Sequence, residues 1–344
     1  MRNCREMLRP RLQGRQTMRA RSGVPRIRAH FTLGRCVLAV SVLCACAGNC
    51  QQPADPLASA HALISGGKLA EAEGALHDYG KTHPESSDAQ FLLGYVLFRE
   101  QKAAESLAAY TAGAQVRRPN AGELKRVASD YVLLGDFGDA DKWFTEVTVE
   151  MPGDADAWYL LGRTKYNENA FTDAVVSFER ALKLQPKYVE AENNLGLSWQ
   201  ELNSTGKAIA AFHAAIDWQG DAPTDPQPFL NLGTLLVDQG DLEQAALNLV
   251  RAAALSPRNP KVHEELSRVY ELQKNLPKAQ DELEQAIALA PNTSGLHFKL
   301  GQIYRREGLR ERAEKEFEIC EKLNSTHSSG NTPNPFNPDL STPH

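Results

Sequence analysis

Apolar residues along most of the chain recur at intervals of three and four, the spacing that brings them onto one face of an α-helix. Each stretch of about 34 residues holds two such stripes, separated by a short polar segment. Ala, Leu, Glu and Gln are frequent there, and they lose little side-chain freedom on entering a helix. The pattern therefore predicts pairs of amphipathic helices and an all-α protein.

The helical pattern repeats with a fixed period. A small residue recurs every 34 residues, with one interval of 37, at Ala60, Gly94, Ala128, Gly162, Gly196, Gly233, Ser267 and Gly301. Sixteen residues after each of these stands a large apolar residue: Leu76, Tyr110, Phe144, Phe178, Phe212, Leu249, Leu283 and Phe317. The series predicts about eight copies of one unit, at residues 53–86, 87–120, 121–154, 155–188, 189–225, 226–259, 260–293 and 294–325.

The residue types at these places explain why each unit would form a helix pair. Small residues let the two helices approach closely, and the large apolar residue fills the space between them. Proline cannot continue a helix, and it closes five units, at Pro84, Pro152, Pro186, Pro257 and Pro291. One unit cannot bury its own apolar face, so neighbouring units are expected to stack and share a core.

The most regular unit contains Trp158, Leu161, Gly162, Ala174, Phe178, Ala181 and Pro186. It resembles the tetratricopeptide repeat, and the resemblance extends over residues 53–325. The resemblance implies an all-α fold, an α-solenoid superhelix of about eight helix-turn-helix repeats. It also implies a protein that binds other polypeptides.

Two further segments modify the array. A three-residue insertion lies within Asp221–Pro226, and we expect the superhelix to bend or hinge there. The second helix of the last unit is expected at Leu309–Leu323. Residues 326–344 are mostly Ser, Thr, Asn and Pro, a composition that predicts a disordered tail.

Residues 1–47 have the features of a secretory signal peptide. Ten Arg and one acidic residue precede Cys36–Ala47, an apolar run of twelve residues. A membrane-spanning helix needs about 20 such residues, so this run is too short to cross a bilayer. There are two alternatives: translation begins later, at Met7 or Met18, or the apolar run is a buried helix and not part of a signal peptide.

The end of this leader offers two processing routes. Ala45 and Ala47 form a small-x-small site, which predicts cleavage before Gly48. Leu43-Cys44-Ala45-Cys46 also resembles a bacterial lipobox, and lipidation of Cys46 is the second route. Both routes predict an exported protein in the bacterial periplasm or cell envelope, lipid-anchored or secreted.

The rest of the chain is acidic. Residues 48–344 hold 28 basic and 42 acidic residues, a net charge of −14. Such a body repels nucleic acid and anionic lipid. We therefore expect protein or peptide partners, no nucleic acid, and membrane contact only through a lipid anchor. Cys320 is the one cysteine in the array, so packing rather than disulfides must hold the fold.

The sequence holds no catalytic or metal-binding pattern that we recognise. His263-Glu264-Glu265-Leu266-Ser267 begins like a zinc-peptidase helix, but Ser267 stands where the second His is required. The array has no C-x-x-C pair. The phosphate-binding motifs G-x-x-x-x-G-K-[ST] and G-x-G-x-x-G are also absent from the sequence. The His residues are scattered, and each is expected at the surface or with a satisfied partner. We expect no metal, no cofactor and no enzymatic activity.

The resemblance also implies where a partner binds, because the first helix of each repeat lines a concave groove. With the small residue as position eight, Asn194 and Asn231 both fall at position six of that helix. An amide can donate and accept, so it can pair with a peptide unit. The two resemble the asparagine ladder in the repeat domain of protein O-glycosyltransferases; a solvated Asn is the alternative. The other groove candidates are Asn193, Tyr159, Arg163 and Tyr166.

Two further groups of residues have both a binding and a structural interpretation. The aromatic group would supply an apolar anchor for a partner or pack into the core: Phe91, Tyr95 and Phe98. The charged group would orient a charged partner or form an ordinary solvated face: Glu264, Glu265, Glu271, Lys299, Arg305 and Arg306.

Together these features favour a non-catalytic scaffold or adaptor that holds a peptide or protein in its groove. The alternative is an exported subunit or lipoprotein of an envelope, polysaccharide-assembly or secretion complex. In that case catalysis would reside in a partner protein. The sequence leaves the identity of the partner and the oligomeric state open.

Overall fold

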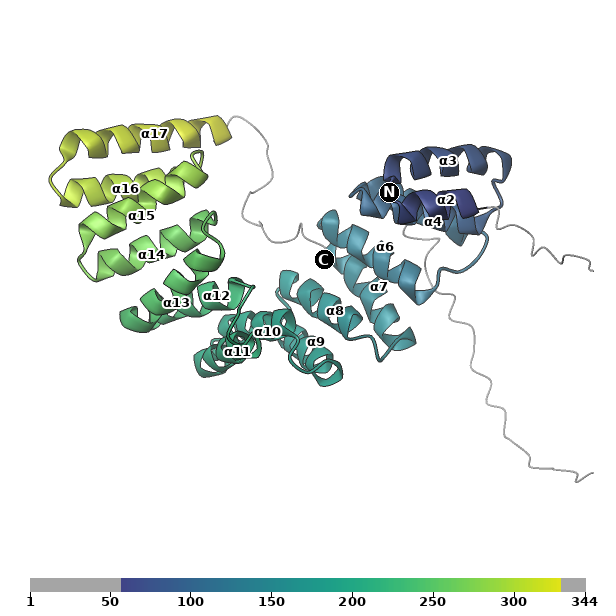
Figure 1. Cartoon of the computed structure of the whole chain (residues 1–344), viewed down its shortest axis with the longest axis horizontal. Helices are drawn as coiled ribbons and strands as arrows, with labels where there is room; N and C mark the ends of the chain where they lie inside the picture. Colours follow the sequence, from purple (N-terminus) through teal and green to yellow (C-terminus); the bar gives the residue numbers. More distant parts are fainter. Residues whose placement is uncertain (1–56, 329–344) are drawn as a thin grey trace, which may run out of the picture. The chain divides into compact units, whose positions relative to one another are not determined.

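The computed structural model describes residues 57–328, which form sixteen helices and no strand (Figure 1). These residues divide into two compact units between Pro119 and Asn120. The predicted signal peptide and its processing site at Cys46 and Gly48 lie outside the described residues, as does most of the predicted tail.

Each of these two compact units is a series of helices in chain order. The first unit contains α2 (Ala58–Ser65), α3 (Leu69–Thr82), α4 (Ser87–Arg99) and α5 (Ala103–Ala114). The second contains α6 (Ala121–Leu133), α7 (Phe137–Glu150), α8 (Ala155–Asn167), α9 (Phe171–Leu184), α10 (Val189–Glu201), α11 (Thr205–Trp218), α12 (Gln227–Gln239), α13 (Leu242–Leu255), α14 (Pro260–Leu272), α15 (Leu276–Leu289), α16 (Ser294–Arg306) and α17 (Arg310–Ser328).

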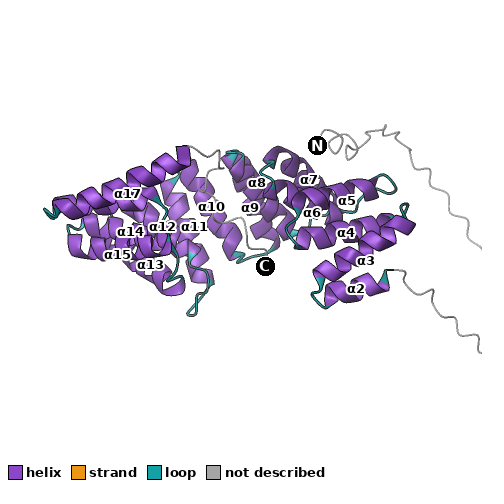
Figure 2. Cartoon of the chain, turned by 90° about the horizontal axis from the view of Figure 1, so that it is seen from above, coloured by secondary structure: helices purple, strands orange, loops and turns teal. Residues whose placement is uncertain are grey.

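The helices pack as consecutive antiparallel pairs joined by short loops (Figure 2). Within each unit, the second helix of a pair also packs on the first helix of the next pair, as α9 does on α10. The all-α fold of repeated helix pairs that the sequence predicts is confirmed.

Proline sets the end of the second helix in five pairs. The helices α3, α7, α9, α13 and α15 each end two residues before a proline. The residue between helix and proline has left the helical region in every case, with φ between −136° and −125° and ψ between 61° and 90°. This is expected, because the proline ring clashes with a helical residue before it.

A close approach of glycine to a large apolar side chain lies at the centre of most pairs. A Cβ atom added to Gly162 would lie 2.6 Å from Phe178, and one added to Gly196 would lie 2.5 Å from Phe212. Both phenylalanine rings are fully buried. The ring therefore occupies the volume that any larger residue in the first helix would need.

The core continues without a break across the insertion at 221–226. Phe212 of α11 belongs to the same buried cluster as Phe229 of α12 and Leu266 of α14. The loop itself is held by Gln219, whose Oε1 accepts from the main-chain N–H groups of Thr224 and Asp225 at 3.0 and 2.8 Å. The buried cluster thus spans the insertion, and the division into two compact units falls at Pro119.

The last helix is longer than the sequence pattern predicts. Helix α17 runs to Ser328, whereas the expected end was Leu323 and the tail was expected from residue 326. Neither proline nor glycine interrupts the chain before Gly330, so nothing in the sequence stops the helix earlier.

Two buried histidines take the same place in the last two pairs. The ring of His263 lies between Glu282 Oε2 at 2.7 Å and the carbonyl oxygen of Pro257 at 3.1 Å. The ring of His297 lies in the same way between Glu316 and the carbonyl of Pro291. These rings tie each helix pair to the loop before it, which is a structural role.

Substitution of Gly196 by Ala tests the close approach at the centre of a pair. We expect the free energy of unfolding to fall by about 1–3 kcal/mol, because the added methyl group overlaps the Phe212 ring. Gly206→Ala is the matched control, since its Cβ meets nothing within 4 Å and alanine favours a helix. Urea unfolding of both variants measures the difference, and equal stability would contradict this account of the packing.

Candidate functional site

The first helices of the pairs in the second unit, α6, α8, α10, α12, α14 and α16, form what we call the first-helix face. Here α8 contacts α10, α10 contacts α12, and α12 contacts α14, whereas consecutive second helices make no comparable contact in the described residues. The first helices of this unit are therefore packed more closely together than the second helices. Side chains at the same repeat positions meet there across neighbouring helices.

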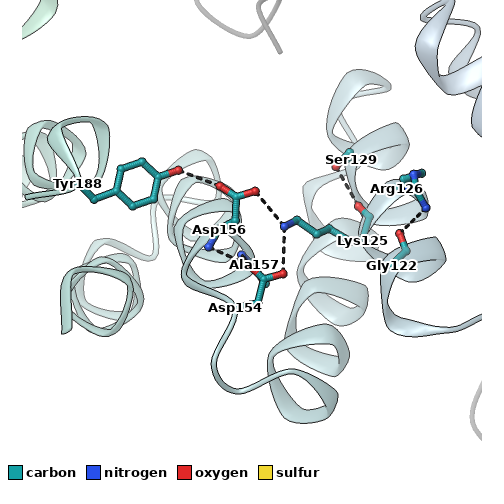
Figure 3. A network of polar contacts seen from close by, with 8 residues as sticks. All are labelled: Gly122, Lys125, Arg126, Ser129, Asp154, Asp156, Ala157 and Tyr188. Carbon is teal, nitrogen blue, oxygen red and sulfur yellow. Dashed lines mark hydrogen bonds and ion pairs between the residues drawn. The ribbon is translucent and has the colours of Figure 1, made fainter. Parts of the chain in front are cut away.

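A lysine joins α6 to α8 at one end of this face (Figure 3). Lys125 Nζ lies 3.0 Å from Asp154 Oδ2 and 2.9 Å from Asp156 Oδ2. The Tyr188 hydroxyl, beside the start of α10, donates to the other oxygen of Asp156 at 2.9 Å. Burial alone would raise the pKa of Asp156, but Lys125 and Tyr188 outweigh it and lower that pKa.

This polar chain was missed in the sequence, although the repeat register contains a signal for it. Lys125 stands at position five of its repeat, the position that Tyr159 and Asn193 occupy in the next two repeats. The carboxylates come from the start of α8, where Asp154 also caps the helix by accepting from the N–H of Ala157 at 3.1 Å.

The three predicted site residues on α8 are half-buried and packed against aromatic neighbours. The Tyr159 ring lies 5.0 Å from the Tyr188 ring, and the Arg163 guanidinium lies 5.7 Å from the Tyr159 ring. Burial, followed by a hydrogen bond and charge from Glu201 of α10, raises the pKa of Tyr166 to about 12. Tyr166 and Glu201 thus connect α8 to α10.

An amide pair joins α10 to α12. Asn231 Nδ2 donates to Asn193 Oδ1 at 2.8 Å, and Asn193 is only 6% exposed. Asn194 instead donates to the carbonyl oxygen of Glu190 in its own helix at 2.7 Å. The structure therefore brings together positions five and six of neighbouring repeats, Asn193 and Asn231, whereas Asn194 bonds within its own helix.

Ion pairs complete the face from α12 to α16. Arg268 of α14 lies 2.6 Å from Asp238 of α12. Lys299 of α16 pairs with Glu264 of α14. Burial would raise the pKa of Glu264, but the hydrogen bond and charge of Lys299, with the charge of Lys261, hold that pKa below its usual value.

The predicted acidic and basic groups of the last two repeats thus largely neutralise each other. Arg306 lies 2.5 Å from Glu271, which adds a second pair between α14 and α16. Glu265 is 4% exposed and pairs with Lys261 at 2.8 Å. Of the six charged candidates, Arg305 lies apart from these pairs, 5.8 Å from the Phe317 ring.

The aromatic candidates lie in the first unit. Phe91 is a core residue, 4% exposed, and a Cβ added to Gly113 would lie 2.7 Å from its ring. Of the two interpretations, its burial agrees with core packing. Tyr95 and Phe98 are half-buried, and the Tyr95 hydroxyl accepts from Arg99 at 3.0 Å.

The described residues form neither a metal-binding cluster nor a membrane-spanning helix. Among residues 57–328, no group of three His, Cys, Asp or Glu side chains is placed to hold a metal ion. Within the same range, every helix is too short or too polar to span a lipid bilayer.

Glu264→Gln tests the electrostatics of the face. The pKa of Glu264 is lowered in the folded state, so its contribution to stability is present at neutral pH and lost as pH falls through the lowered value. We expect the free energy of unfolding to drop by about 0.5–1 kcal/mol near neutral pH, with a smaller difference at about pH 3. Urea unfolding at both pH values measures this, with Glu318→Gln, exposed on α17, as the control.

A loss that persists unchanged in acid would show that the carboxylate charge is not what stabilises the contact. A loss of the same size in the Glu318 control would show that the effect is not specific to this face.

Comparison with known families gives matches along most of the described chain. Three family models match, and each is described as "Tetratricopeptide repeat". Their matches cover residues 57–121 and 159–226, residues 236–303, and residues 294–327.

A curated relative matches over part of its length. The chain is 25% identical over 162 residues to the Protein O-mannosyl-transferase TMTC1 of Mus musculus, which is 46% of this chain and 17% of that protein. The chain therefore spans less than a fifth of the length of that relative.

Solved structures with similar folds cover more of the chain. A tetratricopeptide repeat protein from Parabacteroides merdae is 17% identical, with a TM-score of 0.58 over 77% of this chain and 97% of that one. PilW, described as a type IV pilus biogenesis factor, is 22% identical, with a TM-score of 0.54 over 61% of this chain and 95% of that one. At these identities the similarity shows the fold.

Proposed function

Because this chain belongs to the tetratricopeptide repeat family, we propose that it is a non-catalytic scaffold that binds another protein. In this proposal an extended peptide of the partner lies along the first-helix face, across α8, α10 and α12. The transferase activity in the name of the mouse relative is not part of the proposal, because the match covers 17% of that protein.

The amide pair of Asn193 and Asn231 is the observation that carries this proposal. Each amide uses one of its two polar atoms in the 2.8 Å contact. Asn193 Nδ2 and Asn231 Oδ1 have no partner among the described residues. The pair therefore offers one donor and one acceptor from side chains that already hold each other in place, and this matches the main chain of a peptide.

The neighbouring contacts favour a peptide main chain over a charged ligand at this point. From α12 onward the charged side chains of the face pair with one another, as Arg268 does with Asp238 and Lys299 with Glu264. The amide pair is uncharged, so it adds polarity without selecting a charge.

The residues on either side suit the side chains of such a peptide. Tyr159 and Tyr166 lie on α8, the first helix that contacts α10, and both are half-buried aromatic residues. Asn194 has a smaller role, because its Nδ2 bonds to the Glu190 carbonyl of its own helix and the side chain is not held against a neighbouring first helix. We therefore place the main contribution at Asn231 and Asn193.

A peptide selected from a random library on the intact protein tests this site. We expect Asn231→Ala to weaken its binding about 3- to 10-fold, the value of one or two hydrogen bonds, and Asn194→Ala to weaken it less. Asn248→Ala is the matched control, since Asn248 is half-buried on the second helix α13 and donates to the carbonyl of Gln244 as Asn194 does to Glu190. Calorimetric titration measures the affinities.

Circular dichroism on each variant shows whether the fold is kept. Binding that is unchanged in Asn231→Ala, or lost equally in Asn248→Ala, would remove the amide pair from the proposed site. A library that yields no binder to the folded protein would count against peptide binding as a whole.

We also propose that the chain is exported before it binds its partner. The support is the leader itself, with ten Arg before a short apolar run and a small-x-small site at Ala45–Ala47. If Cys46 were lipidated, the array would be held at a membrane surface. That would favour the second candidate function, a subunit of an envelope assembly or secretion complex.

The mass of the purified chain from its host distinguishes the two processing routes. We expect the N-terminus at Gly48, which intact-mass and N-terminal peptide analysis would show. A chain that begins at Cys46 with added acyl mass, and loses that mass in Cys46→Ser, would establish the lipid anchor instead. A chain that retains residues 1–47 would contradict both routes.

A further inference from the structure

The array ends with a face that every earlier pair of the second unit buries. The large apolar residue of the second helix is at most 1% exposed in the five preceding pairs, at Phe144, Phe178, Phe212, Leu249 and Leu283. Its counterpart in the last pair, Phe317, is half-buried. The same holds three residues on, where Ala286 is fully buried and Cys320 is half-buried.

This difference arises because a following first helix covers the face in the earlier pairs. Leu283 and Ala286 of α15, for example, share a buried cluster with Leu296 and Leu300 of α16. In the described residues no helix follows α17 to do the same for Phe317. The apolar residues there are nonetheless of the type that fills a core, and their exposure is unfavourable.

The open face is a shallow hollow with an apolar centre and a charged rim. It is lined by Phe298, Arg305, Phe317, Cys320, Glu321 and Asn324. The Phe298 ring lies 5.7 Å from the Phe317 ring, and Phe298 is 47% exposed. An exposed aromatic pair of this kind is suited to bury area against another protein surface.

The charges on the rim indicate what that surface is. Arg305 and Glu321 line the same hollow, and neither forms an ion pair with another described residue. The Arg305 guanidinium lies 5.8 Å from the Phe317 ring, and Glu321 follows Phe317 by one helical turn on α17. A rotation by 180° about an axis through this region exchanges the two positions, so each charge meets its opposite in a second copy.

We propose that this end face, formed by α16 and α17, is a two-fold interface between two copies of the chain. Helix α17 packs antiparallel on its counterpart, and Phe298 and Phe317 form the apolar centre. Arg305 pairs with the partner subunit's Glu321, and Glu321 with the partner subunit's Arg305. The peptide site proposed across α8, α10 and α12 uses other helices, so the dimer would present two such sites.

The length of the last helix is consistent with this packing. Helix α17 has 19 residues, whereas the second helices α7, α9, α11, α13 and α15 have 14 each. The extra length extends the face beyond one repeat by about 7 Å at 1.5 Å per residue. A patch with both charge signs can pair with its own copy about a two-fold axis, whereas a patch of one sign would repel it.

Sedimentation of the full processed chain, kept reduced and measured over about 1–100 µM, tests the interface. We expect a concentration-dependent dimer. Arg305→Glu and Glu321→Arg should each weaken dimerisation by on the order of tenfold, because each leaves two like-charged contacts. The double variant restores opposite charges and should dimerise within about threefold of the native chain. Phe298→Asp should abolish the dimer.

Leu247→Asp is the matched control for Phe298→Asp, because Leu247 is 58% exposed on α13 and far along the chain from the end face. It should leave dimerisation unchanged. Circular dichroism on every variant separates loss of the interface from loss of fold, and the double variant does so independently, since a misfolded chain would not be rescued by a second charge reversal.

A chain that stays monomeric at the highest concentration would overturn the proposal. If Phe298→Asp then lowered the melting temperature of that monomer more than Leu247→Asp, the face would be covered from within the same chain, which also overturns it. A dimer that is indifferent to Phe298→Asp, or a double variant that is no better than the single ones, would place the interface elsewhere.

Discussion

The contact between a small residue of the first helix and a large apolar side chain of the second sets the geometry of each repeat. Where Gly162 faces Phe178, or Gly196 faces Phe212, the ring fills the space that a Cβ atom would take. The two helices of a pair can then lie close enough to exclude water from the ring entirely. The same contact recurs in pair after pair, so it also fixes the position of the first helix of the next pair.

The polar contacts of the first-helix face follow from the regular placement of the first helices. Neighbouring first helices are offset, so that position five of one repeat meets position six of the next. This offset pairs Asn193 with Asn231 and Glu264 with Lys299. One geometric relation thus gives an amide contact in the middle of the unit and an ion pair near its end. The chemistry differs only because the residues at the two positions differ.

The ends of a stacked array are its least satisfied parts, because each repeat relies on a neighbour to cover it. The described chain shows this at α17, where Phe317 and Cys320 occupy positions that earlier repeats bury. A solenoid can cover such a face with a polar capping helix, with another segment, or with a second copy. The opposite charges of Arg305 and Glu321 favour a second copy, because each can pair with the other residue of that copy.

The sequence by itself determined the fold class, the number of repeats and the ends of many helices. These features depend on local rules: a period of 34 residues, a small residue sixteen positions before a large one, and prolines that end second helices. It also determined the register of the binding candidates, because every repeat places the same position on the same side of the first helix.

Only the tertiary structure decided which of those candidates touch. The contact of Asn231 with Asn193 instead of Asn194 depends on the offset between two helices 38 residues apart, which no local pattern contains. The burial of Phe91 depends on Gly113 in another helix, and the neutralisation of Glu264 depends on Lys299 in the next repeat. Spacing along the chain fixes the face of a helix, whereas pairing between helices is fixed by how the core lets them approach.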